Sequence, residues 1–170
     1  MSITPLTPPL GPIAPRLLFG TLEDARYALC AVIGRAQRRI TLASPTLEPE
    51  LYEHPSVLQA LTRFILAPRY TRVRILLTAA DARPAAQHQL LTLSRKLSTS
   101  FEIRTVTSPL PGPTASYLVA DQMATVLRLD AGDWRGMYAL ENPAAARTHL
   151  SHFETIWQRC PAPDHAALAV

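Results

Sequence analysis

Apolar positions recur every three or four residues in four segments of the chain, a spacing that is typical of amphipathic helices. The predicted helices span about 21–37, 55–67, 84–97 and 143–157. Thr21 can cap the first helix, and Glu23 and Asp24 follow in its first turn, where acidic side chains are favoured. Pro55 and Pro143 suit first helical positions, because a backbone N–H is not needed there.

Five short runs of apolar and β-branched residues predict strands. They span 40–44, 73–78, 101–106, 116–120 and 125–129. Only 121–124 separate the last two runs, which therefore predict an antiparallel hairpin. A further apolar run at 137–140 is not assigned to a strand. The order α-β-α-β-α-β-β-β-α predicts the α/β class, with a mixed sheet flanked by helices on both faces.

The two ends of the chain are the segments least suited to regular structure. Residues 1–16 are rich in proline and almost uncharged, so they predict an arm or linker, and 161–170 predict a flexible tail. The 170 residues therefore fit one domain, at about 17–160. The N-terminus lacks the basic start and apolar core of a signal peptide, and no apolar run approaches the ~20 residues that span a bilayer. We expect a cytoplasmic protein.

The net charge is +4, and sixteen of the seventeen basic residues are arginines. A basic surplus can indicate a nucleic-acid partner. Here the arginines are scattered along the chain, with only Arg38 and Arg39 adjacent and Arg69, Arg72 and Arg74 loosely grouped. The charge is therefore a weak clue, and the sequence does not favour a nucleic-acid partner.

Histidine and cysteine spacing indicates neither a metal nor a redox site. His149 and His152 lie three residues apart on the last predicted helix, but a third ligand would have to come from Glu154 or a partner subunit. A solvated helix face is the favoured interpretation. Cys30 and Cys160 form no disulfide framework and have no zinc-ligand spacing. With no glycine-rich phosphate loop and no G-x-S-x-G elbow either, we expect no cofactor and no metal.

The order of elements and one terminal motif resemble one repeat of the phospholipase D superfamily. Members of this family open with a helix and a short strand, and they place the catalytic motif on the first strand of a late hairpin. They close with a helix that ends in F-x-x-x-W, as Phe153-Glu-Thr-Ile-Trp157 does here. The resemblance covers about residues 20–159 and implies a phospholipase D-like fold.

The catalytic motif of that family is H-x-K-x-x-x-x-D. Aligning Asp121 with its aspartate puts Thr114 at the histidine position and Ser116 at the lysine position. The only lysine, Lys96, is preceded two residues earlier by Ser94, so no H-x-K occurs anywhere in the chain. In this family the histidine attacks phosphorus and the lysine stabilises charge on the phosphoryl oxygens. The resemblance therefore implies a degenerate, non-catalytic member that is not an enzyme.

The family builds its active site from two facing motifs, so a single repeat implies a homodimer or pairing with a related domain. A relict groove for a phosphate or small polar ligand could remain at the strand ends, where open α/β sheets bind ligands. The residues predicted to line it are Thr114, Ser116, Asp121, Ser44, Thr46, Asp81 and His88. A binding or scaffold module is the first functional hypothesis.

Two alternatives stay open. One is a phosphodiesterase or other hydrolase with a non-standard nucleophile, using Asp121 or His88 as the ionisable group. The other is nonspecific nucleic-acid binding through the arginines, which would depend steeply on salt concentration.

Overall fold

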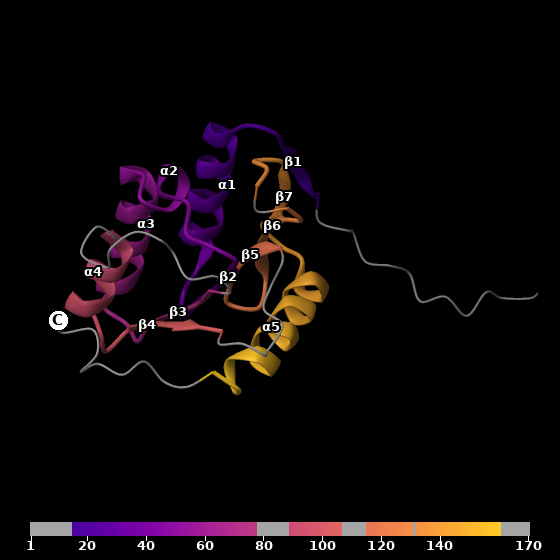
Figure 1. Cartoon of the computed structure of the whole chain (residues 1–170). Helices are drawn as coiled ribbons and strands as arrows, with labels where there is room; N and C mark the ends of the chain where they lie inside the picture. Colours follow the sequence, from indigo (N-terminus) through magenta and orange to yellow (C-terminus); the bar gives the residue numbers. More distant parts are fainter. Residues whose placement is uncertain (1–14, 78–88, 107–114, 131, 161–170) are drawn as a thin grey trace, which may run out of the picture.

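The computed structural model describes residues 15–77, 89–106, 115–130 and 132–160 (Figure 1). Within these ranges seven strands form one mixed sheet in the order β1-β7-β6-β5-β2-β3-β4. The strands are β1 (Leu17–Phe19), β2 (Arg39–Ser44), β3 (Arg72–Leu77), β4 (Phe101–Thr105), β5 (Ser116–Ala120), β6 (Ala124–Arg128) and β7 (Gly136–Ala139). β2, β3 and β4 pair in parallel, and the other neighbours are antiparallel. The predicted mixed sheet is confirmed.

Helices lie on both faces of this sheet, as the sequence predicts (Figure 1). The helices are α1 (Leu22–Arg35), α2 (Pro49–Tyr52), α3 (Pro55–Leu66), α4 (Gln89–Lys96) and α5 (Pro143–Trp157). The first four pack on one face, and α5 covers the other. Among the described residues, no helix combines the length and apolar character needed to cross a membrane.

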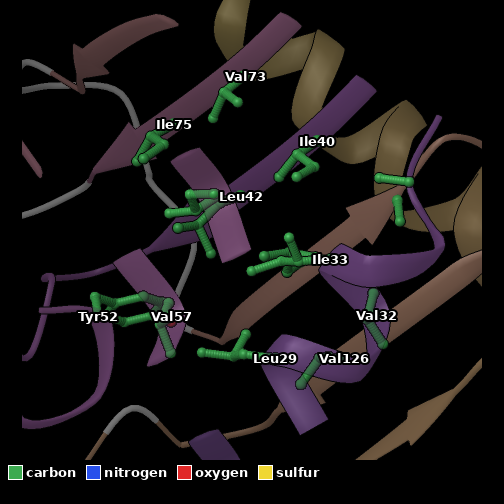
Figure 2. Packing of buried hydrophobic residues seen from close by; sticks show 14 of the residues in the cluster. Leu29, Val32, Ile33, Ile40, Leu42, Tyr52, Val57, Val73, Ile75 and Val126 are labelled. Atoms are coloured by element: carbon green, nitrogen blue, oxygen red, sulfur yellow. The ribbon is translucent and has the colours of Figure 1, made fainter. Parts of the chain in front are cut away.

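Strand side chains alternate between two hydrophobic cores because successive residues of a strand point to opposite faces. Figure 2 shows part of the first core, where Ile40 and Leu42 of β2 and Val73 and Ile75 of β3 meet Ile33 of α1. The other face of the sheet packs against α5. The second core includes Ala43, Leu76, Tyr117, Val119, Phe153 and Trp157. The F-x-x-x-W residues thus anchor α5 to the sheet, with their rings stacked at 5.2 Å.

Three elements of the structure are missing from the sequence-based prediction: α2, β1 and β7. α2 has four residues, too few to show a helical period. β1 has three residues and pairs only with β7, where Phe19 lies opposite Gly136. A Cβ at Gly136 would lie 2.4 Å from Cζ of Phe19, so the glycine permits this close strand pairing. The predicted start of the third helix, at 84–88, lies outside the described residues.

Candidate functional site

One edge of the sheet gathers several of the predicted site residues. β2 ends at Ser44, and β5 begins at Ser116 beside it, because Ala43 and Tyr117 are partners in the antiparallel β2–β5 register. Arg128, the last residue of β6, is the register partner of Ser116. We call this edge, defined by Ser44, Ser116 and Arg128, the Ser116 edge. It is where the family resemblance places the catalytic motif.

Ser116, which the sequence alignment puts at the lysine position of the motif, has a buried side chain. The residue is 3% exposed, and its hydroxyl lies 2.8 Å from the hydroxyl of Tyr52, which α2 brings over the sheet. Tyr52 is itself 2% exposed, and burial raises the pKa of its hydroxyl above the ordinary value. Two neutral hydroxyl groups therefore satisfy each other at the position where the resemblance would put the lysine.

An ion pair fills the neighbouring position. The Arg128 guanidinium is buried, and its Nη2 donates to the two carboxylate oxygens of Glu48 at 2.6 and 3.0 Å. Its Nη1 donates to the carbonyl oxygen of Asp133 at 3.0 Å, and the Trp134 ring lies 5.2 Å away. One nitrogen of the guanidinium is thus shared between both carboxylate oxygens, in a charge-assisted contact that is stronger than a hydrogen bond between neutral groups. The positive charge at the Ser116 edge is thus already matched by a carboxylate.

Burial shapes the ionisation of this pair. It raises the pKa of the Glu48 carboxyl above its ordinary value, and the guanidinium of Arg128 opposes that shift. Although burial alone would lower it, the pKa of Arg128 is raised by the adjacent oxygens of Tyr52 and Glu48. A guanidinium stays charged in proteins, so Arg128 is a fixed cation with a dedicated partner.

A small cavity lies beside these groups. It has a volume of about 10 Å³ and is lined by ten residues that include Phe19, Leu29, Tyr52, Ser116 and Arg128. A volume of this size holds roughly one water molecule. The cavity next to Ser116 therefore has room for a water molecule beside the buried hydroxyl pair.

The other predicted groove residues divide between described and undescribed parts of the chain. Ser44 is fully buried, and its hydroxyl donates to the carbonyl oxygen of Thr46 at 2.6 Å. The Ser44 hydroxyl therefore stabilises the turn after β2, and Thr46 is partly buried there. Thr114, Asp81 and His88 lie outside the described residues, so their place in a groove stays a prediction.

Asp121 lies at the opposite edge of the sheet, at the far end of β5 from Ser116. Its carboxylate oxygens accept hydrogen bonds from the backbone N–H groups of Gln37, Arg38 and Arg39 at 2.9, 2.9 and 3.0 Å. Asp121 has φ 55°, in the left-handed region that aspartate tolerates better than most residues. The structure does not bring Asp121 together with Ser116 as the sequence predicted. The aspartate ties the β5–β6 turn to the start of β2.

The two histidines of α5 both contact Tyr117 on the second face of the sheet. The prediction that they lie on a solvated helix face holds for His152, which is exposed, but not for His149. The His149 ring stacks on Tyr117 at 4.7 Å between centroids and is half-buried, whereas His152 is exposed and its Nδ1 lies 2.8 Å from the Tyr117 hydroxyl. Burial, aided by His152, lowers the pKa of His149. Glu154 pairs with Arg74, and the described residues hold no group of three or more side chains suited to a metal ion.

Comparison with known proteins supports the fold. A family model described as "Domain of unknown function (DUF7931)" matches residues 21–167. No curated protein matches. Among solved structures, the chain is similar to TrmBL2, an archaeal chromatin protein with a novel mode of DNA binding (TM-score 0.62, 13% identity). That match covers 90% of this chain but 56% of TrmBL2, so this chain spans little more than half of that protein.

Two further solved structures are matched over almost their whole length. Nuc from Salmonella typhimurium, a phospholipase D family member, has a TM-score of 0.59 and 13% identity, covering 88% of this chain and 97% of its own. NucT from Helicobacter pylori has a TM-score of 0.60 and 11% identity, covering 88% and 99%. At such identities the likeness establishes the fold and nothing further.

Proposed function

We propose that this chain, which belongs to the family described as Domain of unknown function (DUF7931), is a degenerate phospholipase D-like domain that binds a partner instead of catalysing a reaction. The observation that carries the proposal is the Ser116 edge. The lysine position is a serine whose hydroxyl is buried against Tyr52, and the adjacent Arg128 is neutralised by Glu48.

Phosphoryl transfer requires a nucleophile and a cation that both reach the substrate. Thr114 has no ring nitrogen to attack phosphorus, and Ser116 has no charge to stabilise the phosphoryl oxygens. Arg128 does not replace the lysine, because its N–H groups are directed at Glu48 and at the carbonyl oxygen of Asp133. These contacts support a domain that keeps the fold for binding and has lost the chemistry.

The direct test is hydrolysis of bis-nitrophenyl phosphate by the purified full chain. We expect no release of nitrophenol above the buffer rate, with Ser116→Ala behaving like the natural chain. Because Asp121 or His88 is the ionisable group of the hydrolase alternative, the variants Asp121→Asn and His88→Ala are measured beside them. Release that scales with protein concentration and is abolished by either variant would overturn the proposal and establish a non-standard nucleophile.

The proposal includes a second copy of this fold. The family resemblance is to one repeat over about residues 20–159, and it implies that an active site is built from two facing repeats. We propose that the domain forms a homodimer or pairs with a related domain. Sedimentation of the full chain at micromolar concentration should give the mass of a dimer. If the chain pairs with a related domain instead, it should sediment as a monomer alone and as a heterodimer when a second phospholipase D-like domain from the same organism is added. A monomer under both conditions would contradict this part of the proposal.

A further inference from the structure

Arginines that are scattered along the sequence gather at the edge of the sheet opposite the Ser116 edge. Arg39 and Arg72 are the first residues of β2 and β3 and are partners in the parallel register. The carbonyl oxygen of Arg38 accepts from the backbone N–H of Arg72 at 2.9 Å, and Nε of Arg69 donates to the carbonyl oxygen of Gln37 at 2.6 Å. We call Arg38, Arg39, Arg69 and Arg72, all of them exposed, the arginine cluster.

The topology concentrates further positive charge at this edge. Parallel strands begin at one edge, and the helices that connect them end there, so basic residues of their last turns face the same way. Basic side chains at helix C-termini are favoured by the helix dipole, which explains this second group without a ligand. The eight exposed basic residues at or near the edge are Arg35, Arg38, Arg39, Arg63, Arg69, Arg72, Arg95 and Lys96.

Acidic residues at this edge do not balance that charge. Glu102 pairs with Arg72 at 3.4 Å, and Glu141 pairs with Arg35 at 3.2 Å. Asp121 also lies there, with its carboxylate directed at backbone N–H groups. Over the part of the chain that the structure describes, Arg38 and Arg39 have no acidic partner. Among the residues that the structure describes, neither guanidinium group makes a side-chain hydrogen bond or an ion pair, so both charges are available to a ligand.

The cluster also has an exposed aromatic residue. Tyr70 lies in the chain between Arg69 and Arg72, and it is 65% exposed. A hydrogen bond from Arg72 to Tyr70 raises the pKa of that guanidinium. Arginine binds phosphate oxygens through paired N–H groups, and exposed aromatic rings next to cations stack on bases. The combination fits a ligand that carries both phosphates and rings.

We propose that the arginine cluster binds the phosphodiester backbone of nucleic acid without regard to sequence. Nucleic acid supplies both phosphates and aromatic rings to the arginine cluster and the exposed Tyr70, whereas phospholipid headgroups such as phosphatidylglycerol supply phosphate without a ring. The sequence argues against such a surface because its arginines are far apart in the chain, and the tertiary contacts remove that objection. The inference concerns the edge opposite Ser116 and does not rest on the proposed function.

The test measures anisotropy of a labelled duplex of about 20 base pairs, and of its single strand, with the full chain between about 50 and 200 mM salt. We expect Arg38→Ala/Arg39→Ala to weaken duplex binding roughly tenfold at the lowest salt. The slope of log affinity against log salt should become shallower by about 1.8, since each lost phosphate contact accounts for about 0.9. The matched control is Arg147→Ala/Arg159→Ala, which removes two exposed arginines that lie outside the cluster and, within the described residues, have no acidic partner; it should keep the natural affinity and slope.

Three results would overturn the inference. One is the absence of salt-dependent binding to either nucleic acid at about 50 mM salt. Another is an equal loss in both double variants, because net charge alone would then explain binding. The third is capture of the chain by phosphatidylglycerol vesicles without nucleic-acid binding, which would assign the cluster to a membrane surface. The hydrolysis assay reports on the Ser116 edge, so failure of one proposal is distinguishable from failure of the other.

Discussion

Replacing Asp121 should destabilise the fold, because the one matching residue of the family motif holds two segments of backbone together. Its carboxylate accepts three backbone hydrogen bonds, from Gln37, Arg38 and Arg39, at 2.9–3.0 Å. A hydrogen bond to a charged group contributes about 1.5–3 kcal/mol, and water at this exposed edge can replace part of each one. We expect the lost bonds in Asp121→Ala to cost about 3 kcal/mol.

The backbone at Asp121 adds a second contribution that glycine avoids. With φ at 55°, an alanine would adopt the left-handed conformation at a cost of about 1 kcal/mol or slightly more, whereas glycine adopts it freely. Asparagine keeps one acceptor oxygen and tolerates the conformation. The expected order of stability is therefore the natural chain, then Asp121→Asn, then Asp121→Gly, and last Asp121→Ala.

Urea unfolding followed by circular dichroism measures these differences, and thermal unfolding gives an independent check. A combined loss of about 4 kcal/mol in Asp121→Ala should lower Tm by about 8–16 °C in a chain of this size. If Asp121→Ala stays within about 0.5 kcal/mol of the natural chain, the carboxylate does not hold the edge together. A glycine variant less stable than the alanine variant would refute the left-handed conformation.

Three further predictions concern the Ser116 edge and α5. Glu48→Ala leaves the Arg128 charge buried without its partner, so the free energy of unfolding measured in urea should fall by about 3–5 kcal/mol. The double variant Glu48→Ala/Arg128→Met should recover much of that loss, and strictly additive losses would refute the ion pair. The double variant Thr114→His/Ser116→Lys restores the H-x-K motif but should still show no hydrolysis of bis-nitrophenyl phosphate. Its Tm should be lower than that of Ser116→Met, because the new lysine buries a second cation beside Arg128; measurable turnover would mean that substrate reaches the Ser116 edge. The pKa of His149 is lowered in the folded protein, so the unfolded chain binds more protons and the free energy of unfolding should fall as pH drops below about 6.5. His149→Phe should flatten this pH dependence, and an unchanged slope of unfolding free energy against pH would contradict the prediction.

Local patterns in the sequence were enough for most of the regular structure. Periodicity predicted α1, α3, α5 and the central strands, and single residues predicted their ends. The side chain of Thr21 accepts from the N–H of Asp24 at 3.1 Å, and α3 and α5 begin at Pro55 and Pro143 as predicted. The absence of H-x-K also follows from the sequence alone, since a motif that no residue can form needs no structure to exclude it.

The contacts that give the two edges their character were decided by tertiary structure. Glu48 and Arg128 are 80 positions apart, and they meet because α2 folds over the end of β6. The hydroxyls of Tyr52 and Ser116 meet in the same way. Periodicity reports how one segment repeats and carries no information about which segments become neighbours. The strand predicted at 116–120 already places Asp121 and Ser116 at opposite ends of β5. Only the strand order shows which segments become neighbours, and it brought the scattered arginines to one edge because parallel strands begin side by side.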